Sequence, residues 1–390
     1  MPTPVRLGVI GCGNVSLNRH LPAIREIPEL RVVAAADPTL EQLKRYGDAA
    51  GLDQSDRVAD YRRLLDRVDV DAVVVATPPA YRPAIVLAAL QAGKHVLNEK
   101  PVALTPADAW GMARAARAAG LRLGVMHNYY FIHEHAAIKQ VLESGVIGRP
   151  YLVTLNMLGV EDLPGVDSYQ PRWRHDPRTS GGGVLMDMLH AVYLVGWLMG
   201  QPALGVSAAV DRRLDSLEAV EDVALCRFEF EGGFGLVNVA WGAGPGGVEI
   251  MCAEGRLLLV YERFGTGPFA APEQLHVYRG DERVPVEFDM VLSRGFAGLL
   301  RDFAASIAQE RDPVATGEAG AATLEATLAA YASALLQRQV GLPLDPSDPV
   351  YVHGLAGLGQ LRLAEHSRVS ASGLFELTGS SAVDASDGSG

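Results

Sequence analysis

The sequence contains little cysteine, and its three cysteines lie far apart along the chain. They are Cys12, Cys226 and Cys252 among 390 residues, too few and too scattered for a disulfide framework or a Cys-x-x-Cys metal site. Unpaired thiols are typical of proteins kept in a reducing compartment. We therefore expect a cytoplasmic protein.

Basic residues are scarce relative to acidic ones. Lysine and arginine number 34, against 46 aspartates and glutamates, and the formal net charge is -12. A field of this sign repels nucleic-acid phosphates and anionic lipid surfaces. We expect a small molecule as the partner, and neither nucleic acid nor a membrane.

Long hydrophobic runs are missing as well. The segment Met1 to Arg6 lacks the charged start and apolar run of a signal peptide. The longest apolar stretch, Val184 to Met199, contains Asp187 and His190 and is too short to cross a bilayer. Hydrophobic residues nevertheless make up 48% of the chain, enough for the cores of two domains.

The first part of the chain alternates short apolar or β-branched runs with helical patterns, which is typical of a doubly wound parallel sheet. A helix is expected from Tyr81 to Ala92, and another begins at Thr105 as N-cap with Pro106 in its first turn. This pattern predicts a doubly wound domain over 1–127. The expected strands are Arg6 to Ile10, Arg31 to Ala36, Ala72 to Ala76, His95 to Asn98 and Leu121 to Val125.

The pattern of the second part of the chain predicts an α/β domain over 128–349, with a large, predominantly antiparallel sheet. After a helix from His133 to Ser144, period-two alternation marks strands. Two helices, about Arg294 to Gln309 and Glu318 to Val340, should cover one face of the sheet. A C-terminal extension follows over 350–390, with disorder expected from about 367. The best strand candidates are Asp222 to Glu231, Phe234 to Trp241 and Val248 to Glu254.

A glycine-rich loop follows the first predicted strand and opens a helix. Its sequence is Gly11-Cys12-Gly13-Asn14-Val15-Ser16, close to the Gly-x-Gly-x-x-Gly dinucleotide fingerprint. Gly11 permits a tight turn and Gly13 permits close approach of a pyrophosphate, which then sits on the helix N-terminus. Serine is small enough to replace the third glycine.

Asp37 closes the second strand at the distance where a carboxylate holds the ribose hydroxyls of the adenosine half. Such a carboxylate repels a 2′-phosphate, so NAD is favoured over NADP, although Arg6 or Arg62 could change that preference. The alternative is a glycine turn in another doubly wound protein, with Asp37 merely exposed.

Two further strand ends carry Thr77-Pro78 and Glu99-Lys100-Pro101, at the edge where open parallel sheets bind ligands. A lysine beside a cationic nicotinamide ring binds its proton less tightly, which suits it for proton exchange with a hydroxyl. Lys100 is thus the acid/base candidate. The alternative is a solvated surface turn.

A second constellation begins the sheet domain. It runs from Trp173 and Arg174 through three glycines to Asp187 and His190, which share one helix face at i and i+3. The glycines indicate close approach by a ligand or by backbone. The alternative for Asp187 and His190 is a satisfied core pair.

In these segments the chain resembles the Gfo/Idh/MocA family of NAD(P)-dependent oxidoreductases from about Val5 to Leu344. The resemblance implies a Rossmann domain, a second domain whose open sheet builds homodimers or homotetramers, and a catalytic group of Lys100, Asp187 and His190. It rests on Gly11-Cys12-Gly13, Ala76-Thr77-Pro78, the segment from Lys94 to Pro101, the stretch from Trp173-Arg174 to Gly183, and Ala330-Tyr331-Ala332-Ser333-Ala334.

The sequence departs from the family pattern at three places. The family spaces its aspartate and histidine as i and i+4, and one residue fewer turns His190 by about 100 degrees unless the helix is distorted. Arg82 stands where a histidine is common, and Tyr130 where an arginine is common. These changes suggest a particular substrate pocket.

The sequence therefore predicts an NAD-dependent oxidoreductase that transfers a hydride between the cofactor and a secondary alcohol or ketone of a sugar, cyclitol or related polyol. Lys100, Asp187 and His190 would carry the chemistry. The expected cofactor-binding residues are Gly11, Gly13, Asn14, Val15, Asp37, Thr77, Pro78, Glu99, Lys100 and Asn128, and the expected substrate-binding residues are Tyr130, Trp173, Arg174, Asp187 and His190.

Three alternatives stay open. The cluster His127, His133, Glu134 and His135 suggests zinc, but a His-Glu-x-x-His motif needs histidine at position 137, which is Ala137; we expect no metal. Relatives on the same fold cleave glycosidic bonds through transient sugar oxidation by NAD. A non-catalytic regulator that binds a dinucleotide is the alternative of another class.

Overall fold

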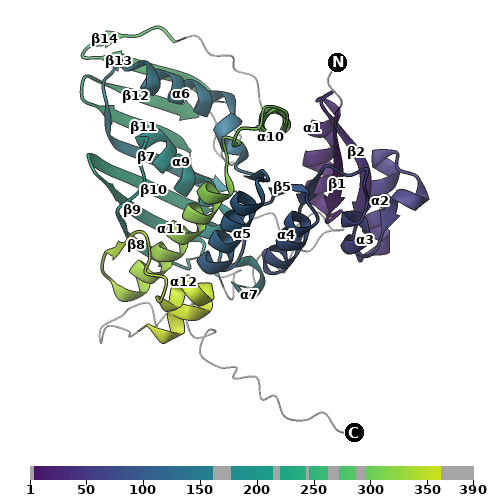
Figure 1. The fold of residues 1–390 in the computed structure, drawn as a ribbon. Helices are drawn as coiled ribbons and strands as arrows, with labels where there is room; N and C mark the ends of the chain where they lie inside the picture. The colour runs from purple at the N-terminus through teal and green to yellow at the C-terminus, as the bar shows by residue number, and fades with distance from the viewer. Residues whose placement is uncertain are drawn as a thin grey trace.

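The computed structural model describes residues 4–160, 177–213, 220–242, 246–261, 272–286 and 295–361. Two β-sheets lie side by side, one in the N-terminal third of the chain and one in the middle (Figure 1). The expected fold, a Rossmann domain followed by an α/β domain with a predominantly antiparallel sheet, is confirmed.

The N-terminal sheet has six strands in the order β3-β2-β1-β4-β5-β6, and all neighbouring strands are parallel. The strand order reverses between β1 and β4, which in open α/β sheets creates a ligand crevice at the carboxyl ends of the strands. The strands are β1 Val5–Ile10, β2 Leu30–Ala36, β3 Arg57–Val58, β4 Ala72–Val75, β5 His95–Asn98 and β6 Leu123–Val125.

Helices connect these strands and cover both faces of the sheet. The predicted cap of α5 is confirmed, since Thr105 Oγ1 accepts the Asp108 N–H at 3.1 Å, and Gly120 ends the helix in the left-handed conformation. The helices are α1 Leu21–Arg25, preceded by the π-turn Ser16–His20, α2 Leu40–Ala50, α3 Tyr61–Leu65, α4 Arg82–Gln91 and α5 Pro106–Ala119.

The second sheet has nine strands in the order β14-β13-β12-β11-β7-β10-β9-β8-β15. All its neighbouring pairs are antiparallel except β7 and β10, which are parallel. The strands are β7 Pro150–Val160, β8 Gly205–Asp211, β9 Val223–Phe230, β10 Gly233–Trp241, β11 Gly247–Cys252, β12 Gly255–Tyr261, β13 Pro272–Arg279, β14 Glu282–Arg283 and β15 Val340–Gly341.

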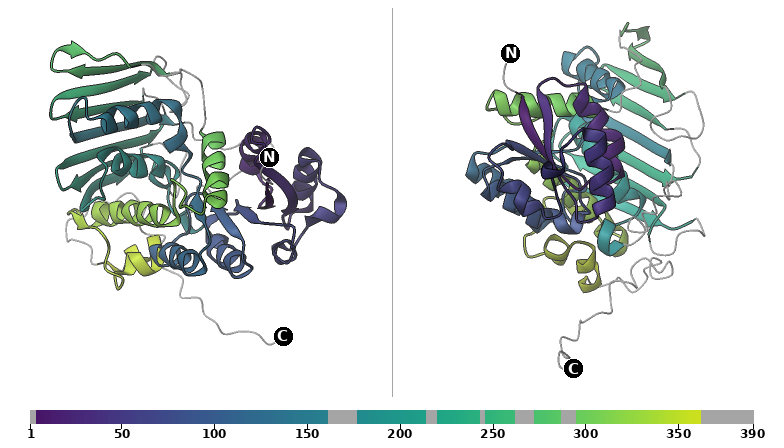
Figure 2. Two further views of the ribbon diagram at one scale, coloured as in Figure 1. Left: turned by 45° about the horizontal axis from the view of Figure 1, so that its top comes forward. Right: turned by 90° about the vertical axis from the view of Figure 1, so that its right-hand side faces the viewer.

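One face of this sheet is covered by α6 His133–Ser144, α9 Leu189–Met199 and α11 Gly317–Leu336 (Figures 1 and 2). The predicted alternation in β9 agrees, because Cys226 and Phe228 are buried while Leu225 and Arg227 are exposed. By length and composition alone α11 could cross a membrane, but 83% of its apolar window is buried in the protein. It is a core helix of the second domain.

The expectation that both C-terminal helices cover this sheet is wrong for the first of them. Helix α10, Phe296–Ala308, buries Leu299, Leu300 and Phe303 in one core with Leu7 and Val74 of the parallel sheet. Figure 2 shows the light-green helix beside the N-terminal domain. The apolar stripe of α10 indicated a buried face but did not specify which sheet would bury it.

The C-terminal extension begins as ordered structure. Helix α12, Pro349–His353, and the 3₁₀ turn Gly354–Gln360 bury Val350 and Leu358 in the main core. The segment from 367, for which disorder was expected, lies outside the described residues.

Candidate active site

Lys100 meets Asp187 at the carboxyl end of β5, where the two domains join. The Lys100 Nζ donates to the Asp187 main-chain oxygen at 2.7 Å and lies 3.3 Å from Oδ1. Their side chains are 18% and 21% exposed, so the pair is shielded but accessible. The structure thus brings together two of the three predicted catalytic residues.

The helix that carries Asp187 is interrupted directly after it. The short helix α8, Val184–Asp187, ends at Met188, whose φ of -99° and ψ of 28° are not helical, and α9 begins at Leu189. This break is the local distortion that the shortened spacing between Asp187 and His190 requires. The angular difference expected for a regular helix therefore does not apply.

His190 is buried in an aromatic cluster that we define as His127, Tyr129, Tyr130, His190 and Tyr193. The imidazole stacks on the Tyr129 ring with 4.0 Å between centroids, and Nδ1 lies 2.8 Å from the Tyr193 hydroxyl. Burial, followed by the charge of Lys100, lowers the pKa of His190 well below its usual range. His190 is therefore neutral at physiological pH.

Tyr193 fixes the arrangement of this cluster, although sequence analysis did not identify it. Its hydroxyl oxygen accepts the Tyr129 N–H at 3.1 Å, and His127 stacks on its ring at 4.0 Å. Tyr130 packs edge-on against the same ring at 4.7 Å. The available signal was its position three residues after His190, on the same helix face.

The glycine loop has the shape that a dinucleotide requires. Gly11 has a φ of +96°, and a Cβ there would lie 2.7 Å from the Ala76 backbone. A Cβ on Gly13 would meet nothing closer than Gln42 Oε1 at 3.9 Å, so the loop has free space before it. Ser16 replaces the third glycine without cost, since its buried Oγ donates to the Gly11 oxygen at 2.6 Å.

The Asp37 carboxylate lies beside this loop. It accepts the Cys12 N–H at 2.7 Å and the Thr39 N–H at 2.8 Å, which leaves a lone pair on each oxygen for a hydroxyl. Arg6 pairs with Asp71 at the opposite end of the strands, and the exposed Arg62 pairs with Asp60. Arg6 therefore cannot serve a 2′-phosphate beside Asp37.

Three neighbouring strands end in buried polar atoms that have no partner among the described residues. They are Thr77 Oγ1 after β4, Asn98 Oδ1 at the end of β5 and His127 Nδ1 after β6. Buried polar atoms are normally hydrogen-bonded, and an unpaired set at the ligand edge indicates a polar ligand. The residues present therefore fit a dinucleotide and a hydroxylated substrate.

Buried charges hold the loop around Lys100. Glu99 Oε1 accepts from His20 Nε2 at 2.9 Å, and Oε2 accepts the Lys100 N–H at 2.8 Å. Burial alone would raise the pKa of Glu99, but His20, Arg82 and Lys100 outweigh burial and lower it. His20 was missed by sequence analysis.

Arg82, which stands in place of the family histidine, is a buried cross-link. It donates to the main-chain oxygens of Thr77 at 2.7 Å and Glu99 at 2.8 Å, and also to that of Pro101. Burial lowers the pKa of Arg82 to about 10. The guanidinium therefore ties the end of β4 to the loop after β5.

The remaining predicted residues are placed as follows. Asn14 and Val15 form the first turn after the glycine loop, Pro78 is exposed, and Asn128 and Tyr130 are buried in the turn after β6. Trp173 and Arg174 lie outside the described residues. The described ranges contain no group of three His, Cys, Asp or Glu side chains that could hold a metal ion.

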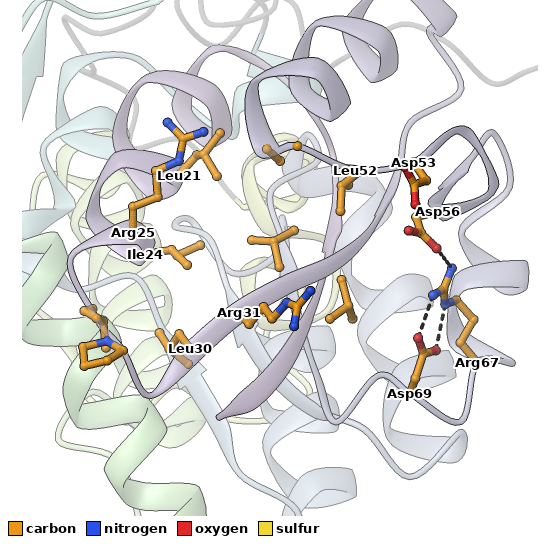
Figure 3. A pocket seen from close by; sticks show the side chains of 16 residues that line it. Leu21, Ile24, Arg25, Leu30, Arg31, Leu52, Asp53, Asp56, Arg67 and Asp69 are labelled. Carbon is orange, nitrogen blue, oxygen red and sulfur yellow. Dashed lines mark hydrogen bonds and ion pairs between the residues drawn. The ribbon is translucent and has the colours of Figure 1, made fainter. Parts of the chain in front are cut away.

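A separate surface pocket of about 510 Å³ lies along the first half of β2 (Figure 3). In it Arg67 is paired with Asp56 at 2.8 Å and with Asp69 at 2.7 Å. The pocket borders Leu30 and Arg31 at the start of β2, whereas Asp37 follows the end of that strand. It is therefore separate from the ligand edge.

Two family descriptions match the chain over most of its described length. Residues 5–127 match an oxidoreductase family with an NAD-binding Rossmann fold. Residues 135–258 match the GFO/IDH/MocA C-terminal domain.

Curated relatives include sugar oxidoreductases. D-apiose dehydrogenase from Paraburkholderia graminis is 30% identical over 352 residues, which are 86% of this chain and 88% of that protein. The dTDP-3,4-didehydro-2,6-dideoxy-alpha-D-glucose 3-reductase from Saccharopolyspora spinosa is 37% identical over 190 residues, or 48% of this chain. The match to that reductase spans only 54% of its length.

Solved structures share the architecture across both domains. The WlbA dehydrogenase from Bordetella pertussis, solved with NADH and UDP-GlcNAcA, has a TM-score of 0.74 and 26% identity. The match covers 88% of this chain and 100% of that one. An oxidoreductase domain protein from Kribbella flavida has a TM-score of 0.75 at 25% identity, with 88% and 100% covered.

Proposed function

Because the chain belongs to the Gfo/Idh/MocA family of NAD-binding oxidoreductases, we propose that it transfers a hydride between NAD and a secondary alcohol or ketone. The proposed substrate is a sugar, cyclitol or related polyol. The observation that carries the proposal is the contact of Lys100 Nζ with Asp187 at the ligand edge of the Rossmann sheet. The domains proposed are 1–127 and 128–349, with an extension over 350–390.

Bound NAD supplies a hydride acceptor or, in reduced form, a hydride donor. Lys100 would take the proton from the substrate hydroxyl during oxidation and return it during reduction. For this step Lys100 starts as the neutral amine, and Asp187, which contacts Nζ through its main-chain and side-chain oxygens, stabilises the ammonium that forms. Exposure of the pair is low, so water competes weakly with the substrate for these groups.

His190 would act as a hydrogen-bond donor to a substrate oxygen. The buried Tyr193 hydroxyl already accepts the Tyr129 N–H, and its own hydrogen has His190 Nδ1 as its one acceptor among the described residues. With Nδ1 occupied, the proton of the neutral imidazole is on Nε2. This leaves Lys100 as the base.

Asp37 would select NAD by binding the ribose hydroxyls, with Gly11, Gly13, Asn14 and Val15 around the pyrophosphate. Thr77, Pro78, Glu99 and Asn128 complete the proposed cofactor site at the strand ends. Tyr130, Trp173 and Arg174 are the proposed substrate contacts beyond the catalytic group. The glycosidase and regulator alternatives lack a specific observation in their favour.

We also propose that the protein is a homodimer or homotetramer through the face of the second sheet that none of the described helices covers. That face exposes 51% of Leu225, 43% of Phe234 and 39% of Leu258, side chains that a partner copy would bury. Light scattering of Phe234→Glu would show smaller particles if this holds. The three cysteines are buried and unpaired, which supports a cytoplasmic location.

The function is tested by incubating the protein with a panel of polyols and sugars and measuring NADH absorbance, with NADP in parallel. A substrate that produces NADH with wild-type protein, but not with Lys100→Ala, supports the proposal. Release of a free sugar from a glycoside without net NADH would contradict it.

A further inference from the structure

Two of the three glycines before α8 make room for other residues of the protein itself. A Cβ on Gly182 would lie 2.2 Å from the Tyr331 hydroxyl. A Cβ on Gly183 would lie 2.2 Å from the Glu221 main-chain oxygen and 2.7 Å from its Oε2. The close approach that the glycine run indicated is therefore made by Glu221 and Tyr331.

Glu221 is 1% exposed and accepts three hydrogen bonds. The donors are the Gly183 N–H at 2.8 Å, the Leu185 N–H at 3.0 Å and the Tyr331 hydroxyl at 2.6 Å. In addition, the Val184 N–H donates to the Glu221 main-chain oxygen at 3.0 Å. The carboxylate thus holds the whole first turn of α8 against α11.

This turn carries Asp187 at its end. The Asp187 N–H donates to the Gly183 oxygen at 2.9 Å, and Asp187 in turn contacts Lys100 Nζ. A continuous path of contacts therefore runs from Glu221 through Gly183 and Asp187 to Lys100. A shift of Gly183 would move Asp187 away from the amine.

We propose that ionised Glu221, together with Tyr331, is a positioning residue that fixes Asp187 against Lys100. The catalytic meaning of this role rests on the proposed function. Glu221 itself contacts neither member of the reacting pair among its hydrogen-bond partners in the described residues. It acts by keeping α8 in place.

The ionised form suits these three donors best, because protonation replaces an acceptor position with an O–H that itself needs an acceptor. The groups that face Glu221 are the Tyr331 hydroxyl from α11, the Cys226 thiol from β9 and the amides of α8, with no lysine or arginine among its described partners. Burial, only partly opposed by Tyr331 and these amides, raises the pKa of Glu221 to about 7.

Glu325 provides a matched control on α11. It is equally buried, and it also accepts one aromatic donor, Trp110 Nε1 at 2.7 Å, and one amide, that of Leu344 at 2.5 Å. These bonds do not touch α8. Glu221→Gln and Glu325→Gln therefore both replace a buried, hydrogen-bonded carboxyl group with an amide, and only the first should affect Asp187.

Turnover is the first measurement. Glu221→Gln should lower kcat about tenfold. It should also remove the rise in kcat through pH 7. The affinity for NAD, measured by fluorescence, should change less than about twofold. Glu325→Gln should keep the wild-type pH profile of kcat. An unchanged profile in Glu221→Gln, or the same loss in both variants, would overturn the proposal.

The second measurement needs no substrate. The rate at which an amine-specific reagent modifies Lys100 in the full chain, followed by mass spectrometry, should rise about threefold or more in Glu221→Gln, because the hydrogen bonds that Lys100 Nζ donates to Asp187 loosen. It should be unchanged in Glu325→Gln. Even if no polyol is oxidised, this modification rate tests whether Glu221 positions Asp187. Equal rates in wild type and Glu221→Gln would refute that role.

Discussion

Two buried glutamates lie on either side of the Lys100–Asp187 pair, and their pKa values shift in opposite directions. Burial raises the pKa of Glu221, and its neutral donors only partly oppose that effect. Burial acts the same way on Glu99, but His20, Arg82 and Lys100 outweigh it and lower the pKa. The sign of the shift is thus decided by nearby cations rather than by burial.

This difference divides the site into two parts. On the Rossmann side the pKa of Glu99 is lowered, so this carboxylate stays ionised at neutral pH. The side formed by the second domain uses a carboxylate that titrates near neutrality. We expect changes on the Rossmann side to affect stability and cofactor binding, and changes around Glu221 to affect turnover and its pH dependence.

The largest effect should come from the residue between the two sides. Lys100→Ala should lower kcat about 10³-fold or more, because it removes the proposed acid/base group. The affinity for NAD, measured by fluorescence titration, should stay within a few-fold of the wild-type value. Turnover near the wild-type level in Lys100→Ala would show that Lys100 is not the acid/base group.

Breaking the Rossmann pair should cost stability. His20→Leu leaves Glu99 buried without its hydrogen-bonded partner and should lower the free energy of unfolding by about 3 kcal/mol. The lowered pKa of Glu99 stabilises the fold above about pH 4.5, and this contribution is lost as the pH falls through the folded-state pKa.

Denaturant titrations at several pH values check this expectation. The difference between wild type and His20→Leu should therefore be complete at pH 7 and shrink below pH 4.5. Lys44→Met, which breaks an exposed pair with Asp48, should leave the free energy of unfolding almost unchanged. If the difference in the free energy of unfolding between wild type and His20→Leu grew as the pH fell, it would contradict the stabilising role of the His20–Glu99 pair.

On the cofactor side, Asp37→Ala should weaken NAD binding about tenfold, because the ribose hydroxyls lose the charged carboxylate that accepts their hydrogen bonds. NADP binding should fall less or rise, because the carboxylate no longer repels the 2′-phosphate. Parallel titrations with both cofactors measure the ratio. An unchanged ratio would show that Asp37 does not set the preference.

The smallest effect should come from Tyr331→Phe. Its hydroxyl lowers the pKa of Glu221, so its removal should raise that pKa and move the rise of kcat to higher pH by about half a unit, equivalent to roughly 0.7 kcal/mol. Tyr46→Phe is the control, since the buried Tyr46 hydroxyl has no partner among the described residues. A shift in both variants would point to general loosening.

The parts of the site that are local in sequence were predictable. Gly11, Gly13, Asp37 and Lys100 belong to short motifs at strand ends, and strand ends follow from apolar runs and turn residues. The helix start at Thr105 was equally readable, because capping depends on residues within one turn.

The parts that depend on distant residues were not. His20 contacts Glu99, which is 79 positions away, and Glu221 contacts Tyr331, which is 110 positions away. A single sequence does not show that residues so far apart come into contact. The break at Met188 has no proline or glycine to signal it. The parallel pairing of β7 with β10 follows from the assembled sheet rather than from either strand.

The crossing of α10 has a consequence for protein synthesis. Leu7 and Val9 of β1 are made long before Leu300 and Phe303, which complete their core and follow most of the second domain. During translation the part of this sheet face that α10 buries therefore stays exposed until α10 leaves the ribosome, although α1 and α2 already cover the rest of the face. The fragment 1–127 lacks α10 and would expose to water the apolar side chains that α10 buries.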